Sequence, residues 1–82
     1  MSQLVLYHRI ADPRCAAVRA EIVRRGLKPQ VDFQNVESDG AAGFAALGGR
    51  AVPALWDGAR LHEGEDRIRL VLDAMMPAEG SA

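Results

Sequence analysis

The 82-residue chain is 49% hydrophobic and 26% charged, a balance that is typical of one folded domain and excludes a disordered segment. Its ten basic and eleven acidic residues give a net charge of −1, and no basic run carries interleaved aromatic residues, so nucleic acid is excluded as a partner. The single cysteine, Cys15, cannot form an internal disulfide, and no apolar stretch approaches the length of about 18 residues that spans a membrane. We therefore expect a cytoplasmic protein that does not associate with membranes.

The first third of the chain predicts a strand followed by a helix. Gln3–His8 is an apolar run without helical spacing, which is typical of a buried strand. Asp12 then supplies an N-cap, and Pro13 follows it at the first helical position. A helix is therefore predicted over Pro13–Arg25, ended by Gly26. The apolar stripe of this helix consists of Cys15, Val18 and Ile22.

The middle of the chain predicts a strand, a weak helix and a hairpin. Gln30–Val36 alternates apolar and polar residues, which indicates a second strand. Asp39–Leu47 is rich in alanine but interrupted by glycines, so a short helix is expected there. The dipeptide Asp57-Gly58 separates two apolar runs, Ala51–Trp56 and Ala59–His62, and this arrangement predicts a hairpin with a two-residue turn.

The last predicted element is a helix, and it completes the order β-α-β-α-β-β-α. The helical spacing of Ile68, Val71, Leu72 and Met75 predicts this helix, and Pro77 ends it. A four-stranded mixed sheet covered by three helices is the expected α/β architecture, because two βα units require a parallel pair with a right-handed crossover. We expect one domain over residues 1–76 and a mobile tail over residues 77–82.

Three short motifs stand in order along the chain: "LYHRIADPRC", "GGRAVPALWDG" and "LHEGEDRI". In that order, and with the predicted elements, they resemble the basic residue and Cys-Pro-Tyr-Cys of a glutaredoxin, its Gly-x-Arg-Thr-Val-Pro stretch and its Gly-Gly-x-Asp-x-Leu segment. The chain is also similar to the N-terminal domain of glutathione transferases. Glu63 precedes Ile68 by five residues, however, which is the spacing of the glutaredoxin pattern, whereas transferases usually have four. The resemblance implies a thioredoxin-like fold over nearly the whole chain.

The same resemblance implies a site for glutathione or for a thiol-containing peptide or protein. It implies a cis peptide bond between Val52 and Pro53, with the backbone of Val52 pairing with the cysteine of the ligand; the alternative is a trans proline at a strand start. Arg9 matches a residue that binds a glutathione carboxylate. Glu65 and Asp66 match the segment that holds the γ-glutamyl end. The charges of Arg9, Glu65 and Asp66 are also typical of a solvated surface, and the dipole of the last predicted helix would stabilise Asp66 at its start.

Asp12 and Cys15 decide which chemistry is expected. By resemblance, Asp12 occupies the place of the nucleophilic cysteine and Cys15 that of the resolving cysteine, so dithiol chemistry and a bridged iron–sulfur cluster are not expected. Asp12 is also a sufficient N-cap, and Cys15 also fits a buried apolar position. We favour a module that binds without dithiol oxidoreductase activity. The alternative is a one-thiol, glutathione-dependent disulfide oxidoreductase in which the helix N-terminus favours a Cys15 thiolate.

The arginines of the first helix and the two histidines are the remaining candidate residues. Arg14, Arg24 and Arg25 make one face of the first helix basic, which suits an acidic protein partner but is also typical of a solvated face. His8 and His62 are not at metal-ligand spacing to Cys15 or to each other, so no metal is expected.

Overall fold

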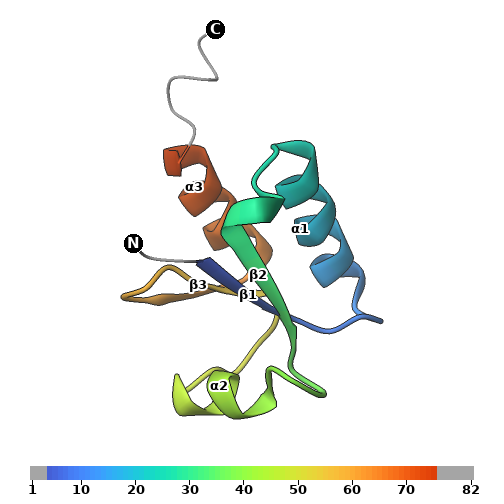
Figure 1. Ribbon diagram of the computed structural model, residues 1–82, viewed down its shortest axis with the longest axis vertical. Helices are drawn as coiled ribbons and strands as arrows, with labels where there is room; N and C mark the ends of the chain where they lie inside the picture. Colours follow the sequence, from blue (N-terminus) through green and yellow to red (C-terminus); the bar gives the residue numbers. More distant parts are fainter. Residues whose placement is uncertain (1–3, 76–82) are drawn as a thin grey trace, which may run out of the picture.

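The computed structural model describes residues 4–75 as a mixed four-stranded sheet with three α-helices, and the predicted order of elements is confirmed (Figure 1). Residue 76 and the tail predicted over residues 77–82 lie outside this range. A short 3-10 helix, η1, that the sequence did not predict precedes the second strand. The elements are β1 (Leu4–His8), α1 (Pro13–Arg24), η1 (Lys28–Gln30), β2 (Val31–Asn35), α2 (Ala41–Ala46), β3 (Ala54–Trp56), β4 (Leu61–Glu63) and α3 (Glu65–Met75).

β1 lies inside the sheet, whose strand order is β2-β1-β3-β4. It pairs in parallel with β2, across the crossover that α1 makes, and antiparallel with β3. The register aligns Leu6 with Phe33 on one side and with Leu55 on the other. Because residues in register share a face, these three side chains lie on the same face of the sheet.

Both ends of α1 form as the local sequence predicts. The helix begins directly after its N-cap, Asp12, and it ends at Arg24, one residue earlier than predicted. Gly26 then adopts a φ of 74°, and the Leu27 N–H donates to the Ile22 carbonyl at 3.0 Å. This is a Schellman ending, in which glycine allows the left-handed conformation and the next residue returns to the core.

The predicted hairpin is confirmed, but its predicted two-residue Asp57-Gly58 turn is wrong. Trp56 pairs with Leu61, so residues 57–60 make the connection. The Asp57 carboxylate accepts the backbone N–H groups of Ala59 and Arg60 at 2.8 and 2.7 Å. A side-chain acceptor thus closes the connection, as aspartate commonly does in turns.

Several elements are shorter than the sequence predicts, including β2, which covers Val31–Asn35 of the predicted Gln30–Val36, but β3 and α2 differ most. β3 begins at Ala54 rather than at Ala51, because Pro53 has no N–H for the strand ladder. α2 covers only Ala41–Ala46 of the predicted Asp39–Leu47, and glycines follow it. Gly48 has a φ of 74°, a conformation that ends the helix.

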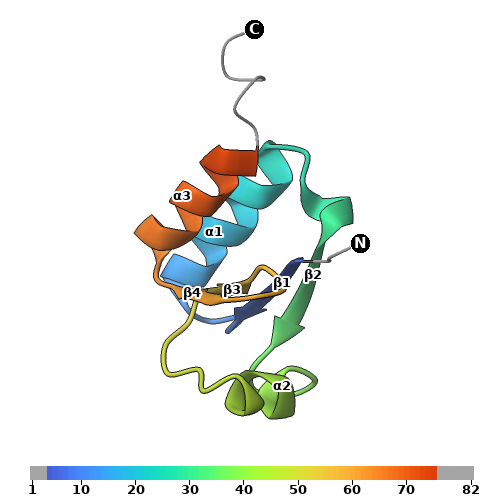
Figure 2. The same ribbon diagram turned by 90° about the vertical axis from the view of Figure 1, so that its left-hand side faces the viewer.

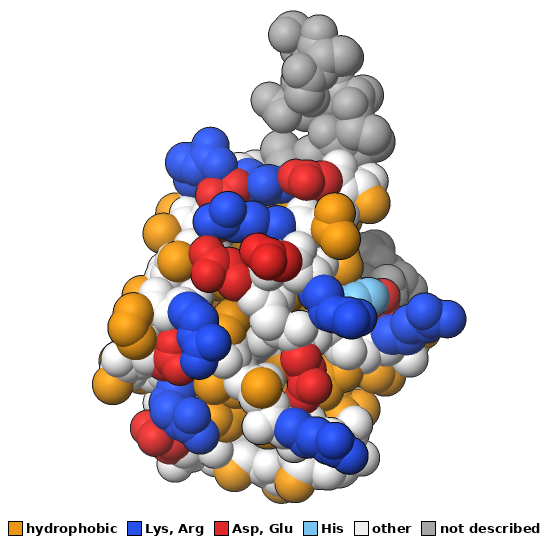
Figure 3. All heavy atoms as spheres, turned by 180° about the vertical axis from the view of Figure 1, so that it is seen from behind, with side chains coloured by type: hydrophobic (Ala, Val, Ile, Leu, Met, Phe, Trp, Pro, Cys, Tyr) orange, Lys and Arg blue, Asp and Glu red, His pale blue; other side chains and the backbone are white. Residues whose placement is uncertain are grey.

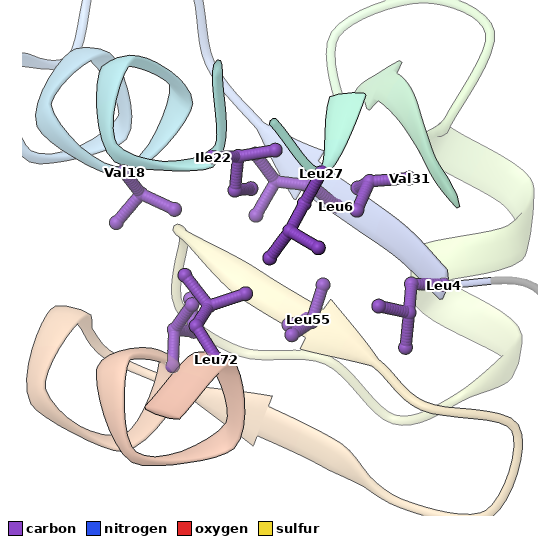
Figure 4. Close-up of a cluster of buried hydrophobic side chains, with 9 residues drawn as sticks. Leu4, Leu6, Val18, Ile22, Leu27, Val31, Leu55 and Leu72 are labelled. Atoms are coloured by element: carbon purple, nitrogen blue, oxygen red, sulfur yellow. The ribbon is translucent and has the colours of Figure 1, made fainter. Parts of the chain in front are cut away.

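The main core lies between one face of the sheet and the pair of helices α1 and α3. Figure 4 shows Val18 and Ile22 of α1 turned toward Leu72 of α3, with Leu55 of β3 between the helices and the sheet. Burying each such side chain contributes about 1.5–3 kcal/mol, so this layer supplies most of the stability of the fold. Its members are Leu4, Leu6, Val18, Ile22, Leu27, Val31, Leu55, Ile68 and Leu72.

α2 lies away from this core, on the other side of the sheet (Figure 2). Its Phe44 ring packs against Tyr7 of β1, with ring centroids 5.4 Å apart. A Cβ atom at Gly43 would lie 3.0 Å from the Tyr7 hydroxyl oxygen, so a side chain there would require the tyrosine to shift slightly. The glycine that weakens the helix in the sequence thus leaves room for the Tyr7 hydroxyl.

An ion-pair network joins α1 to α3 on the outside of the core. The Glu21 carboxylate accepts hydrogen bonds from Arg24 and Arg25, and Arg25 also reaches Asp73 of α3 at 2.8 Å. The Arg24 and Arg25 guanidinium groups lower the pKa of Glu21 to about 2. The basic face that the sequence predicts on α1 is therefore largely neutralised, because Glu21 lies between two of its three arginines.

Acid is expected to remove the contribution of Glu21 to stability. A carboxyl whose pKa falls from about 4.3 in the unfolded chain to a lower folded value stabilises the fold above the unfolded pKa, and the effect disappears as the pH falls through the folded value. The difference in free energy of unfolding between wild type and Glu21→Gln should therefore shrink as the pH falls from about 5 to about 2, as measured by urea denaturation. A difference that stays constant over this range would contradict the assignment.

Candidate functional site

The residues that the sequence singles out meet at one end of the sheet. β1 ends at His8, β3 begins at Ala54, and Tyr7 pairs with Ala54 across the two strands. The segments that continue these strands therefore start side by side: Arg9 leaves β1 and Val52–Pro53 enters β3. The start of α1 and the cis-proline segment share this end of the molecule, as the resemblance implies.

The start of α3 joins the same end of the sheet through β4. Ala54 pairs with Glu63, and the backbone N–H of Gly64 donates to the Pro53 carbonyl at 2.9 Å. Glu65 follows as the first residue of α3. Both long helices thus begin at this end and run toward the opposite end of the sheet (Figure 2).

Asp12 caps α1 and is held as a carboxylate. Its Oδ1 accepts the backbone N–H of Arg14 at 2.8 Å and that of Cys15 at 3.3 Å. The pKa of Asp12 is lowered, chiefly by the Arg14 hydrogen bond and further by the Cys15 bond and the charges of Arg14 and Arg9. A fixed negative charge therefore occupies the position that the resemblance gives to a reactive thiol.

Cys15 is fully buried one turn into the same helix, on the apolar stripe with Val18. Its Sγ accepts the backbone N–H of Arg9 at 3.3 Å, so the connection from β1 covers the sulfur. Burial raises the pKa of the thiol, and the charge of Asp12 acts in the same direction, whereas the Arg9 N–H opposes them. A buried thiol with a raised pKa is a poor nucleophile at neutral pH.

Arg19 fixes the connection between β1 and α1, a role that sequence reasoning missed. Its guanidinium donates to His8 Nδ1 at 2.9 Å and to the carbonyl oxygens of Arg9 and Ile10 at 3.3 and 3.4 Å. Burial, followed by the charge of Arg19, lowers the pKa of His8, so its Nδ1 acts as an acceptor. The available sequence signal is the position of Arg19 one helical turn after Cys15, which places it beside the start of the helix.

Arg9 already has a carboxylate partner. Its Nε lies 3.2 Å from Glu37 Oε2, and the two side chains are 48% and 59% exposed. The Val36 N–H donates to the His8 carbonyl at 2.9 Å, which places Glu37 beside Arg9. An exposed pair of this kind contributes about 1 kcal/mol or less, so the carboxylate of a ligand is able to displace Glu37.

The segment before β3 has a defined shape. The Val52–Pro53 peptide bond is cis, as the resemblance implies, and both side chains are buried. Glu63, which sequence reasoning did not assign to the site, accepts the backbone N–H groups of Arg50 and Ala51 at 2.6 and 3.2 Å. Within residues 4–75 the backbone N–H and C=O of Val52 form no hydrogen bond, which leaves both groups for a ligand.

The two predicted acidic residues lie in the first turn of α3. The Glu65 carboxylate accepts a hydrogen bond from Arg69 at 3.1 Å, so part of its charge is compensated. Asp66 is exposed and, within the described part of the chain, forms no ion pair. Asp66 is thus the freer of the two acidic groups for an ammonium group of a ligand.

The charged residues around the site form pairs of opposite sign: Arg9 with Glu37, Arg14 with Asp12 and Arg69 with Glu65. The face of the molecule seen in Figure 3 likewise carries basic and acidic side chains next to one another rather than a field of one sign. Within residues 4–75, no group of three His, Cys, Asp or Glu side chains is placed to hold a metal ion. No helix in the same range combines the length and the apolar character that crossing a membrane requires.

Comparison with known proteins identifies the fold. No family model matches the chain, and no curated protein matches it in sequence. In structure it is similar to oxidised glutaredoxin 2 from Chlamydomonas reinhardtii, with a TM-score of 0.61 and 16% sequence identity over 99% of this chain and 85% of that one. The chain therefore has a glutaredoxin-like thioredoxin fold, and the predicted fold class is confirmed.

Replacing Arg19 with methionine is expected to loosen the connection while keeping the apolar stem of the side chain. Hydrogen exchange at the amides of Arg9 and Ile10, and labelling of Cys15 by a thiol reagent, should both become at least about tenfold faster, the effect of losing hydrogen bonds to a charged group. Arg24→Met, on the exposed side of the same helix, is the matched control and should change neither rate. Wild-type rates in Arg19→Met would show that the guanidinium does not hold this segment.

Proposed function

We propose that the protein is a glutaredoxin-like binding module that takes glutathione, or the cysteine segment of a thiol-containing peptide or protein, without dithiol exchange. The observation that carries this proposal is the pair formed by Asp12 and Cys15. An ionised carboxylate caps the helix where a reactive thiol would be required, and Cys15, the single cysteine of the sequence, is fully buried. The degenerate Asp-Pro-Arg-Cys motif thus forms the start of a helix but contains no nucleophile at its first position.

The chemistry of glutathione supports the binding half of the proposal. The tripeptide carries two carboxylates, one ammonium group and two amide linkages, so its site needs separated charges and a backbone edge. Arg9 offers a guanidinium, Val52 offers an unpaired backbone N–H and C=O, and Glu65 and Asp66 offer carboxylates to the ammonium group. These groups come from three segments that converge at one end of the sheet.

The absence of exchange chemistry follows from the nucleophile that the step requires. Disulfide exchange needs a thiolate that can reach the sulfur of the substrate. The Asp12 carboxylate does not attack a disulfide, and its charge repels the thiolate form of a ligand. Cys15 would have to leave its place under the Arg9 N–H before it could react. Its burial therefore weighs against the alternative of a one-thiol oxidoreductase.

Two further expectations remain predictions. A cytoplasmic location is proposed from the single cysteine and from the lack of a long apolar stretch in the sequence. An acidic protein partner on α1 would reach Arg14 and Arg24, whose side chains are 72% and 71% exposed, more readily than Arg25, which is 16% exposed. On Arg24 it would have to displace Glu21.

A titration with glutathione followed by amide NMR tests the binding site. Millimolar glutathione is expected to shift the signals of Arg9, Val52, Glu65 and Asp66 together, because the ligand spans all of their segments. S-methylglutathione should shift the same signals, since binding requires no thiol chemistry.

The matched fragment cysteinylglycine lacks the γ-glutamyl group. It should shift Arg9 and Val52 and leave the two acidic residues of α3 nearly unchanged. If none of the four amide signals shifts with millimolar glutathione, the proposed function is wrong.

A further inference from the structure

Glu63 is a charged residue of this end of the sheet to which the resemblance gives no role. In "LHEGEDRI" it stands where the glutaredoxin pattern has the first of its two glycines. A glycine at this position has no side chain, so the contacts of the Glu63 carboxylate are specific to this chain. These contacts indicate the role of Glu63.

The Glu63 side chain ties β4 to the segment in front of β3. Glu63 Oε2 accepts the Arg50 N–H at 2.6 Å and the Ala51 N–H at 3.2 Å. Gly64, the residue after Glu63, donates its N–H at 2.9 Å to the carbonyl of Pro53, two residues after Ala51. The residue between these two attachments is Val52, so its backbone is fixed from both sides.

The attachment is made with an ionised group. The hydrogen bonds from Arg50 and then Ala51, together with the charge of Arg50, lower the pKa of Glu63, so it is a carboxylate at neutral pH. Hydrogen bonds to a charged acceptor are roughly twice as strong as neutral ones. A single oxygen that holds two successive N–H groups also fixes the orientation of the peptide planes between them.

We propose that Glu63 is a positioning residue that fixes the Arg50–Ala51 segment, and that it thereby presents the Val52 backbone to an extended, cysteine-containing peptide ligand. The inference rests on the proposed function for its ligand, and it adds the group that holds the recognition edge in place. A peptide that pairs with a backbone edge binds more tightly when that edge is already ordered, because less conformational entropy is lost on binding. Glu63 itself does not need to touch the ligand.

Two variants of Glu63 and one control test this role. Glu63→Ala removes the acceptor, and Glu63→Gln keeps an acceptor oxygen without the charge. The control is Asp32→Asn, which changes a strand carboxylate that accepts a hydrogen bond from the side chain of Gln34. Hydrogen exchange at the Arg50 and Ala51 amides is measured without ligand, and the Kd for glutathione is measured by NMR titration.

In Glu63→Ala we expect exchange at these two amides to become at least about tenfold faster and the Kd to rise by about tenfold, as expected for the loss of two charge-assisted hydrogen bonds. Glu63→Gln should restore part of both effects, and Asp32→Asn should show neither. Unchanged protection of the amide of Leu55, in the centre of the sheet, would show that the alanine variant remains folded.

Wild-type exchange at Arg50 and Ala51 in a folded Glu63→Ala variant would overturn the inference. Faster exchange with an unchanged Kd would also overturn it, because the segment would then be held without effect on the ligand. If wild type binds no glutathione, the proposed function fails and the presentation of Val52 to this ligand fails with it. Exchange in the ligand-free variants would still decide separately whether Glu63 holds the segment.

Discussion

The hold of Arg19 on the short connection between β1 and α1 is the interaction on which this end of the molecule depends. Arg19 binds the imidazole of His8 and two carbonyl oxygens of the connection, and it leaves the Arg9 N–H directed at the sulfur of Cys15. The same path of the chain brings Asp12 to the first turn of α1. The cover over the thiol and the path of the chain at Arg9 therefore depend on one guanidinium.

The N-terminus of α1 explains why a carboxylate is tolerated where the resemblance implies a thiol. Unpaired N–H groups and the helix dipole stabilise a negative charge at this position, whether it is a thiolate or a carboxylate. Asp12 satisfies those groups permanently, whereas a thiolate would satisfy them only until it reacted. A helix start that would favour a thiolate thus also accommodates an aspartate as an N-cap, which agrees with the proposed binding without exchange.

The order of elements was predictable because its signals are local. The proline after Asp12, the glycine at position 26 and the alternation in the strands each act within a few residues, and the burial of Cys15 follows from its spacing to Val18. The contacts made by Arg19 and Glu63 were not predictable in this way. The Arg19 bonds depend on the path of the chain between β1 and α1. The Glu63 bonds join segments that are close only after the sheet has formed, and no periodicity in the sequence marks an acceptor for a distant backbone N–H.

We propose that one residue, Asp12, separates this scaffold from thiol exchange. Glutathione-dependent disulfide reduction measured on Asp12→Cys tests this role of Asp12 most directly. The variant restores Cys-Pro-Arg-Cys at a helix N-terminus, where the first thiol would be exposed and its thiolate favoured. We expect the variant to reduce a disulfide substrate while the wild type shows little turnover, and Cys15→Ser in the wild-type background should change almost nothing. Substantial wild-type turnover that Cys15→Ser abolishes, or a folded Asp12→Cys variant without activity, would contradict the account.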